Sequence, residues 1–494
     1  MARYRCDVCQ VFEYDPAHGD QATGVTPGTE PPEFPEDWQC PICRSDRSHL
    51  HIVEVEPKKT VEQTVVCPVC GATHAITVSH YGLGYAEGYL GEWRREADLL
   101  EVHMAEIHQI AATGASVVEP MRTQRPVLSW DEILILGAQL ARLPLNHDEP
   151  VDTRTVIGPR ADHPLVIETP IYVTHMSFGA LSREIKLALA RGSAAVGTAM
   201  CSGEGGMLEE VRDASYRYIL EYVPNHYTTT PEDLRMVDAV EIKIGQSAKP
   251  GMGGHLPAEK VTPEIAAVRG FPPGREITSP ARFEEIRDAE TLRETIEHLR
   301  DATDGRPVGV KLAAGRIEDD LAVVLPAGAD FVTVDGRPGA TAAAPRVVKD
   351  ATSVPTPFAL HRVRAFLDRH GADDISLVAT GGLRISADFA RALAMGADAV
   401  AIGTAALMAC ACQQYRLCST GTCPVGVTTQ DPALRRRLRV DISARMLENY
   451  LTVSTEELRT FARLTGHDDV HALSVDDLCT TNTEISDHTG IRHV

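Results

Sequence analysis

The sequence has too few basic residues to balance its acidic ones. Its 494 residues include 48 Lys and Arg against 69 Asp and Glu, which gives a formal net charge of −21 at pH 7. Surfaces that bind nucleic acid or anionic lipid need a basic patch, so this composition argues against both partners. Aromatic residues are also scarce, at 5%, whereas the chain has 38 Gly and 31 Pro. Such a composition favours an α/β core of small aliphatic side chains, and the length allows two or three domains.

The sequence also lacks a long hydrophobic run. The longest weakly polar stretch, 397–412, is interrupted by Asp398, Gly403 and Thr404, and it is too short and too polar to cross a bilayer. The first residues, Met-Ala-Arg-Tyr-Arg-Cys, contain no apolar signal core. We therefore expect a cytoplasmic protein, in which the 12 Cys do not form a disulfide framework. Their spacing predicts metal sites instead.

The first predicted metal site is made by two cysteine pairs near the start of the chain. Cys6-Asp-Val-Cys9 and Cys40-Pro-Ile-Cys43 supply four thiolates. A tetrahedral set of four sulfurs suits either Zn or a single Fe.

A second metal site is predicted from Cys67-Pro-Val-Cys70 and the two histidines of a predicted helix, 93–112, His103 and His108. Two Cys and two His lie within the zinc-finger ligand pattern and predict a structural Zn. Other histidines near the cysteines compete as ligands, and a pair of structural cysteines without metal is the alternative.

The third cysteine group is Cys412-x5-Cys418-x4-Cys423, which is followed by Pro-Val-Gly. Three thiolates cannot close a tetrahedral mononuclear site alone, but they can hold the three irons of a [3Fe–4S] cluster. Cys410 is an alternative fourth ligand, although we expect it to be buried.

From about residue 165, short β-rich runs alternate with helical stretches. Eight strands with helical crossovers predict an α/β protein with a (β/α)8 TIM barrel, and an open doubly wound sheet is the alternative. Gly-rich endings of the last two strands favour the barrel. The predicted strands are 171–174, 198–201, 218–222, 240–244, 308–312, 331–334, 377–379 and 399–402, and the predicted helices include 182–195, 231–237, 291–302 and 386–395.

Residues 4–46 resemble rubredoxin. The resemblance is carried, in order, by Tyr14-Asp15-Pro16, Pro27-Gly28-Thr29, Phe34-Pro35, Asp37-Trp38 and Cys40-Pro41. It implies a mononuclear iron that carries one electron, and a structural zinc ribbon is the alternative. Gln10 and Arg44 stand where rubredoxins usually have glycines.

Residues 165–430 resemble the flavin domain of the glutamate synthase large subunit. The shared motifs are Met176-Ser-Phe-Gly-Ala-Leu-Ser182, Ser202-Gly-Glu-Gly-Gly206, Ala248-Lys-Pro-Gly251 and the cysteine pattern that ends in Cys423-Pro-Val-Gly. The flanking sequence looks more like the standalone flavin subunits of this superfamily, including the N-methylglutamate synthase type. The resemblance implies FMN and a [3Fe–4S] cluster as cofactors.

The resemblance also implies where FMN binds. Glycines that end the last two strands of a barrel let backbone N–H groups approach a phosphate. Lys311 lies in an apolar strand and would stabilise the negative charge of reduced flavin near N1; a core lysine paired with a carboxylate is the alternative. The implied cofactor-binding residues are Met176, Ser177, Gln246, Lys311, Thr380, Gly381, Gly382, Gly403 and Thr404, and the implied catalytic residues are Lys311, Glu204 and Lys243.

Lys249 and Arg269 stand at positions where the family binds the carboxylates of 2-oxoglutarate. His255 stands where the family has a substrate Gln, and Met252 where it has a Glu. The His-His-Asp run of the family is replaced by 281–285. These departures leave the acid and the nitrogen donor open.

The sequence thus predicts an oxidoreductase that reduces the imine of a 2-oxo acid, with electrons passing from the rubredoxin iron to the [3Fe–4S] cluster and then to FMN. The alternatives are a flavoenzyme for another amine or acid, and an electron-transfer subunit of a larger complex. We expect an oligomer, with a separate glutaminase or electron-donor subunit. The predicted domains are a rubredoxin-like domain (1–50), a zinc-finger-like module (51–115), a linker (116–164), the FMN barrel (165–430) and a helical tail (431–494).

Overall fold

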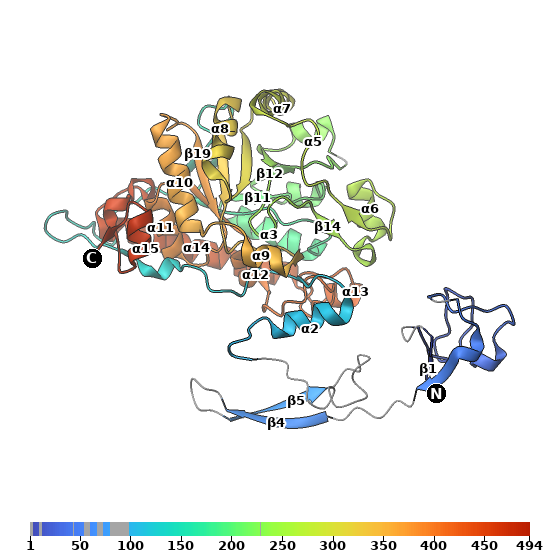
Figure 1. Cartoon of the computed structure of the whole chain (residues 1–494). Coiled ribbons are helices and arrows are strands. Elements are labelled where there is room, and N and C mark those ends of the chain that lie inside the picture. The colour runs from blue at the N-terminus through green and yellow to red at the C-terminus, as the bar shows by residue number, and fades with distance from the viewer. Residues whose placement is uncertain are drawn as a thin grey trace. The chain divides into compact units, whose positions relative to one another are not determined.

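The computed structural model in Figure 1 describes residues 3–8, 12–42, 44–53, 60–66, 73–79, 98–227 and 229–494. These residues belong to two compact units, Met1–Ala115 and Ser116–Val494. Among the described helices, none is both long and apolar enough to span a membrane.

The first unit contains a small antiparallel sheet with an aromatic core. The sheet has the order β2-β1-β3, with β1 at Arg3–Cys6, β2 at Glu13–Tyr14 and β3 at Leu50–Val53. The ring of Phe34 packs edge-on against Tyr14, with centroids 4.8 Å apart, and is tilted against Trp38 at 5.1 Å. These rings belong to one buried apolar cluster that also contains Cys6, the last residue of β1, and Cys40.

In the remainder of the first unit, the described residues form one hairpin, β4 (Thr60–Val66) with β5 (Thr73–Ser79), and one helix, α2 (Met104–Thr113). The predicted helix 93–112 was wrong at its start, because residues 98–103 are not helical. The carboxylate of Asp98 accepts hydrogen bonds from the backbone N–H groups of Leu100 and Glu101, both at 2.9 Å. This local bond favours a turn over a helix. Residues 93–97 lie outside the described part.

The second unit is built around a closed barrel of eight parallel strands, which confirms the predicted fold class. Each strand agrees with its predicted range to within one residue at either end. The barrel strands are β10 (Ile171–Val173), β11 (Ala199–Cys201), β12 (Arg217–Tyr222), β13 (Ala239–Lys243), β16 (Val308–Ala313), β17 (Phe331–Asp335), β19 (Ser376–Thr380) and β20 (Ala399–Ile402). The register pairs Lys243 at the end of β13 with Lys311 of β16, so two lysines lie side by side on neighbouring strands.

Helices surround this barrel, as Figure 1 shows. They are α3 (Arg183–Ala195), α4 (Glu209–Asp213), α5 (Pro231–Arg235), α6 (Pro263–Arg269), α7 (Ala289–Ala302), α8 (Ile317–Ala327), α9 (Arg346–Ala351), α10 (Thr356–Arg369), α11 (Ser386–Ala394), α12 (Thr404–Cys410), α13 (Pro432–Arg435), α14 (Val440–Thr465) and α15 (Thr483–His488). Short strands outside the barrel are β6 (Val118–Glu119), β7 (Ile133–Ile135), β8 (Thr155–Ile157), β9 (Leu165–Ile167), β14 (His255–Leu256), β15 (Ile277–Thr278), β18 (Ala344–Pro345), β21 (Leu478–Thr480) and β22 (Arg492–His493).

The β8–β9 hairpin packs against the amino-terminal end of the barrel. Ile157, Leu165 and Ile167 form one buried apolar cluster with residues at the starts of the barrel strands, such as Ala239 and Phe331. Apolar packing therefore closes this end, and the polar side chains described below gather at the opposite, carboxyl end of the strands.

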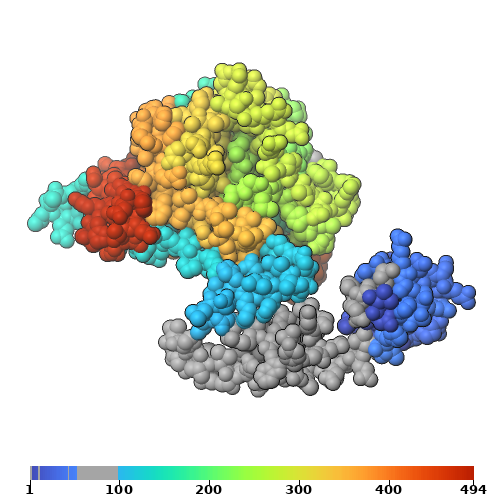
Figure 2. All heavy atoms as spheres, in the orientation of Figure 1, coloured from blue at the N-terminus to red at the C-terminus, as the bar shows by residue number. Residues whose placement is uncertain are grey.

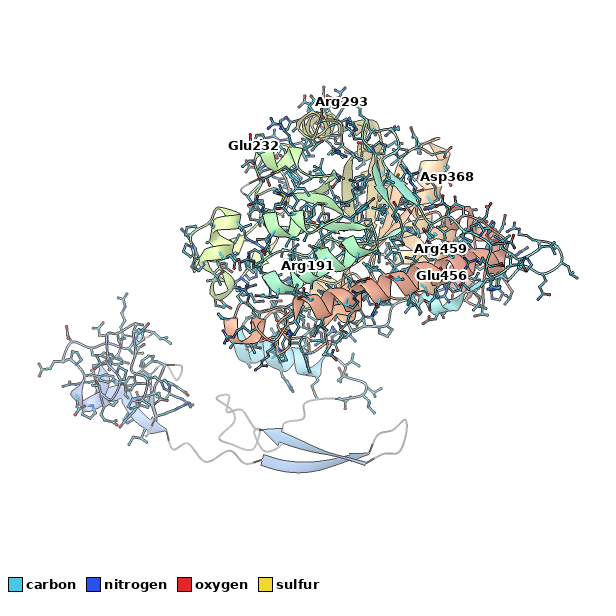
Figure 3. All side chains as sticks on the ribbon, turned by 180° about the vertical axis from the view of Figure 1, so that it is seen from behind. Arg191, Glu232, Arg293, Asp368, Glu456 and Arg459 are labelled. Carbon is cyan, nitrogen blue, oxygen red and sulfur yellow. The ribbon has the colours of Figure 1, made fainter. Side chains whose placement is uncertain are left out.

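The segments that flank the barrel in sequence pack against it. Trp130 and Ile133, from the segment expected to be a linker, are buried in the main core. Strand β7 pairs with β21, and Figure 2 shows the C-terminal residues in red beside the cyan segment that contains β7. Figure 3 shows α14, which carries Glu456 and Arg459, crossing the back of the unit beside Arg191 of α3. The two helices can approach closely because Gly192 of α3 has no side chain. A Cβ there would lie only 2.7 Å from the carbonyl oxygen of Ala444.

Candidate active site

A solvent-open cavity of about 210 Å³ lies at the carboxyl end of the barrel strands. It brings together every residue of the barrel unit that was predicted to bind flavin or substrate, to ligate the cluster or to act in catalysis, apart from the alternative ligand Cys410. These are Met176, Ser177, Glu204, Lys243, Gln246, Lys249, His255, Arg269, Lys311, Thr380, Gly381, Gly382, Gly403, Thr404, Cys412, Cys418 and Cys423. Their roles stay predictions, but one cavity can serve all of them.

Glu204 and Lys243 form a buried ion pair in this cavity. The Nζ atom of Lys243 donates to Oε2 of Glu204 at 2.6 Å, and Ser279 and Tyr227 direct their hydroxyls at the other oxygen. Burial by itself favours the neutral acid, but Lys243 and Ser279 lower the pKa of Glu204 to about 2. Burial likewise opposes the charge of Lys243, but Glu204 and Glu221 raise its pKa. Both groups are therefore charged at neutral pH.

A second buried cluster, His175, Glu221 and Glu241, lies beside Lys311. The Nε2 atom of His175 lies 3.1 Å from Oε2 of Glu241, and its Nδ1 atom lies 3.9 Å from Oε2 of Glu221. The backbone N–H of Gly203 donates to Nδ1 at 3.2 Å. In the neutral ring this bond leaves the proton on Nε2, facing Glu241.

The charges of this cluster favour the protonated, cationic form of Lys311. Burial lowers its pKa, but the fields of Glu221, Glu241 and Asp335 outweigh burial and raise it. Within the described part of the chain, Lys311 forms no ion pair. Lys311 lines the cavity, so the structure does not favour the alternative of a core lysine paired with one carboxylate.

The glycine turns after β19 and β20 allow a close approach to the backbone. Gly381 has φ +103°, and a Cβ there would lie 2.1 Å from the carbonyl oxygen of Gly336, so only glycine fits. Arg384 follows this turn, lines the cavity and is partly buried. Burial lowers its pKa, and among the described residues it has no ion-pair partner. A cation beside glycine-rich backbone fits a phosphate group such as that of FMN.

Lys249 and Arg269 form the cationic wall expected for an acid. Burial and the nearby Lys243 lower the pKa of Lys249 to about 8, and its Nζ donates to the carbonyl oxygen of Gly253 at 2.8 Å. Arg269 donates through Nη2 to the carbonyl oxygens of Phe178 at 2.7 Å and Glu204 at 3.2 Å. Among the described residues, its buried Nε atom has no hydrogen-bond partner, which fits an anionic ligand.

His255 differs from the other predicted substrate ligands. Its side chain is 42% exposed, and its Nε2 atom contacts Oε1 of Glu276. It lies on the two-residue strand β14, at the rim of the cavity. The position expected to bind substrate is therefore already paired with a carboxylate.

The three cysteines of the third group line the cavity together. Burial and the neighbouring thiols Cys412 and Cys423 raise the pKa of Cys418. Burial also opposes ionisation of Cys423, but backbone N–H groups of residues 425, 427 and 428 lower its pKa. The Nζ atom of buried Lys260 donates to the carbonyl oxygen of Cys418 at 2.5 Å. N–H groups and an ammonium around sulfur fit thiolates that ligate an anionic cluster.

Cys410 is buried at the end of α12 and is not among the residues that line the cavity. Sequence reasoning missed five charged or titratable residues of the site: His175, Glu221, Glu241, Lys260 and Arg384. The signal for Glu221 and Glu241 was present, since each interrupts an apolar barrel strand, where a charge needs a partner.

The amino-terminal metal sites are described only in part. Cys6 and Cys40 are buried, whereas Cys9 and Cys43 lie outside the described residues. Arg44 has φ +62°, the left-handed conformation for which glycine is favoured. Its replacement of the usual rubredoxin glycine therefore places a side chain in a strained position.

The second predicted site cannot be assembled from the described residues, because Cys67 and Cys70 lie outside them. His103 precedes α2, and its Nδ1 atom lies 3.3 Å from Oε2 of Glu106. His108 lies on α2, which has no buried residue. The zinc site stays a prediction.

Parts of both units match known protein families. Residues 101–468 match the family model for the conserved region in glutamate synthase, and residues 3–50 match the rubredoxin model. A glutamate synthase large subunit-like protein of Rhizobium meliloti is 39% identical over 79% of this chain and 93% of its own length. An archaeal glutamate synthase [NADPH] of Archaeoglobus fulgidus is 34% identical over 85% of this chain and 87% of its own. A solved structure of a mandelate oxidase variant is 19% identical to this chain. The match covers 71% of this chain and 88% of the oxidase chain, with a TM-score of 0.44. This similarity is too low to indicate function.

Proposed function

We propose that this chain, which belongs to the glutamate synthase family and carries a rubredoxin domain, is a flavin- and iron–sulfur-dependent oxidoreductase that reduces the imine of a 2-oxo acid. The main support for this proposal is that one cavity combines glycine turns, buried cations and three cysteines. Each of these features suits one component of the reaction: a flavin phosphate, an acid and an electron carrier.

The cofactors are assigned to the residues whose chemistry fits them. We assign FMN to Met176, Ser177, Gln246, Lys311 and the two glycine turns, with Arg384 added as a ligand of the phosphate. The cluster is assigned to Cys412, Cys418 and Cys423, and the mononuclear iron to Cys6, Cys9, Cys40 and Cys43. When bound, FMN supplies the hydride and the iron centres supply single electrons, in the order rubredoxin iron, [3Fe–4S] cluster, flavin.

The remaining residues bind the acid and handle protons. Arg269 and Lys249 are assigned to the carboxylates of the 2-oxo acid, because charge-assisted hydrogen bonds from buried cations are strong. Lys243 keeps its proton at neutral pH and lies 2.6 Å from Glu204. We assign Lys243 as the proton donor at Nζ, and Glu204 as the carboxylate that receives the positively charged amine.

A related flavoenzyme that acts on another amine or acid is the second candidate. His255 contacts Glu276 at the rim, and Met252 replaces the acidic residue of the family motif. Either change alters how the nitrogen donor and the acid are recognised. We also propose a separate subunit as the source of electrons or of ammonia.

Titration of the oxidised holoenzyme with 2-oxo acids tests the proposal. A lost charge-assisted contact costs ~1.5–3 kcal/mol, so Arg269→Ala should weaken acid binding roughly tenfold or more while flavin content stays at the wild-type level. Metal and flavin analysis after anaerobic purification should find FMN, iron and sulfide. If no 2-oxo acid perturbs the flavin spectrum, or if Arg269→Ala binds as well as wild type, the substrate assignment is wrong.

A further inference from the structure

Lys186 is a buried cation that the reaction described above does not use. It lies on α3 with 1% of its surface exposed, and it is not among the residues that line the active-site cavity. Burial lowers its pKa to about 8, so most of it is protonated at pH 7. A buried charge needs polar partners, and the partners of Lys186 lie at the carboxyl end of the barrel strands.

Backbone carbonyl oxygens satisfy all three donors of the Lys186 ammonium. Its Nζ atom donates to the carbonyl oxygens of Met176 at 3.0 Å, Cys201 at 3.3 Å and Ser202 at 2.5 Å. Cys201 ends β11 and Ser202 follows it, whereas Met176 lies in the loop after β10. One side chain therefore joins the carboxyl ends of two neighbouring barrel strands.

The peptide group between Met176 and Ser177 is held from a second side by Gly203. A Cβ at Gly203 would lie 2.5 Å from both the carbonyl oxygen of Met176 and the backbone nitrogen of Ser177, so this peptide packs directly against the glycine. Gly203 is itself anchored, since its N–H donates to Nδ1 of His175 at 3.2 Å. Because Lys186 holds the oxygen of the same peptide, the rotation of the peptide is set as well as its position.

This arrangement leaves the backbone N–H of Ser177 directed at the cavity. The peptide bond is trans, so its N–H points opposite to its C=O and away from Lys186. Met176 and Ser177 line the cavity and Lys186 does not, which places the N–H on the cavity side. Among the described residues it has no hydrogen-bond partner. A free backbone donor at a cavity wall is a contact for a ligand acceptor.

We propose that Lys186 is a positioning residue that aims the N–H of Ser177 at the ring system of bound FMN, a role that rests on the proposed function. The ring is the part of the flavin that must lie near the reacting groups. Gly203, against which the peptide packs, directly precedes Glu204, which is assigned to the reacting amine. The phosphate is assigned elsewhere, to the glycine turns and Arg384.

Loss of this bond should affect reduced FMN more than oxidised FMN. Reduced flavin carries more negative charge, and a hydrogen bond to a charged acceptor is stronger than one to a neutral acceptor. Lys186→Met frees the peptide to rotate, so the Kd should rise about fivefold for oxidised FMN and about fiftyfold for reduced FMN. This tenfold difference lowers the two-electron midpoint potential of the flavin by about 30 mV.

Amide hydrogen exchange tests the contact directly. Mass spectrometry with electron-transfer fragmentation follows the amide of Ser177 at pH 7, in the flavin-free chain and after addition of FMN without any acid. FMN should slow exchange at this amide at least tenfold in the wild type, because the free donor becomes bonded. In Lys186→Met the slowing should be largely lost and the midpoint potential should fall. If Lys186→Met does not fold, Lys186→Gln, which is also uncharged, allows the same comparison.

Thr198→Val is the matched control. The hydroxyl of buried Thr198 donates to the carbonyl oxygen of Ile171 at 2.6 Å, and these residues lie at the amino-terminal ends of β11 and β10. The variant removes a buried link between the same two strands, far from the cavity. It should lower the Tm, as Lys186→Met does, but leave the flavin potential and the protection of Ser177 unchanged.

Each other outcome has a definite meaning. If FMN does not protect the Ser177 amide in the wild type, the positioning role is wrong. A lower potential in Lys186→Met with full protection of Ser177 also overturns it, because the lost charge alone then explains the shift. An unchanged potential, or an equal fall in Thr198→Val, overturns it too. If the chain binds no FMN, the proposed function fails and the role of Lys186 fails with it.

Discussion

Binding of a 2-oxo acid should weaken as pH rises through 8, because Lys249 loses its proton there. Burial is the main cause of the lowered pKa, and the charge of Lys243 adds to it, whereas Glu204 and Glu221 partly oppose it; the resulting pKa is about 8. A lysine contributes to anion binding only while it is protonated. The acid binds the ammonium form of Lys249 more tightly than the neutral amine. The affinity for the acid is therefore greatest below the pKa of Lys249 and falls above it.

The size of the effect follows from the pKa. With a pKa of about 8, about 90% of Lys249 is protonated at pH 7 and about 10% at pH 9. The apparent Kd for the acid should therefore rise about tenfold between these two values, which equals about 1.4 kcal/mol of binding free energy. Glu204 cannot contribute in this interval, because its pKa is about 2.

The assay is a titration of the oxidised holoenzyme with 2-oxoglutarate, followed by the flavin spectrum at half-unit steps of pH. Lys249→Arg should bind the acid with little change from pH 7 to 9, because arginine stays protonated. Lys249→Met should bind weakly at every pH and show no transition. A wild-type affinity that is flat across this range, or a transition that persists in Lys249→Met, would refute the assignment of Lys249 as an acid ligand.

Three further predictions concern the cofactor sites. Gly403→Glu should abolish flavin content, whereas Gly403→Ala should keep it, since φ there is −110° and a Cβ would meet its nearest atom, Cγ2 of Thr174, at 3.2 Å. Lys260→Met should lower the midpoint potential of the cluster in an EPR-monitored redox titration, because a buried positive charge beside Cys418 is lost; Lys260→Arg should keep the wild-type potential. Arg44→Gly should stabilise the rubredoxin fold by about 1 kcal/mol, seen as a higher urea midpoint for loss of its iron absorbance, and Arg44→Ala should not.

The barrel was predictable because parallel strands leave a local signal. The sequence of a strand that is covered on both faces is a short run of apolar residues, and turn residues separate each run from the next helix. The strand ends were found to within one residue for this reason. The start of the predicted helix 93–112 was wrong because that prediction used apolar spacing alone. The side chain of Asp98 accepts hydrogen bonds from the backbone of its near neighbours, and apolar periodicity carries no information about such bonds.

The candidate site was only partly predictable, for a different physical reason. Residues with a shared motif, such as Lys243 and Lys249, could be named from sequence, and the structure places them in one cavity. The partners that set their protonation are distant in sequence: Glu204 is 39 residues from Lys243. Such pairings depend on strand order and register.

The charges of the site indicate that its ligands are anionic. Most buried charges in a folded protein have a partner of opposite sign, and Glu204 and Lys243 meet this requirement with each other. Lys249, Arg269, Lys311 and Arg384 all line the cavity, yet none forms an ion pair with the residues that the structure describes. Three nearby carboxylates, Glu221, Glu241 and Asp335, compensate the charge of Lys311. The other three cations are costly in one place unless anions bind there. Under the proposed function, the phosphate of FMN and the carboxylates of the acid would supply this negative charge.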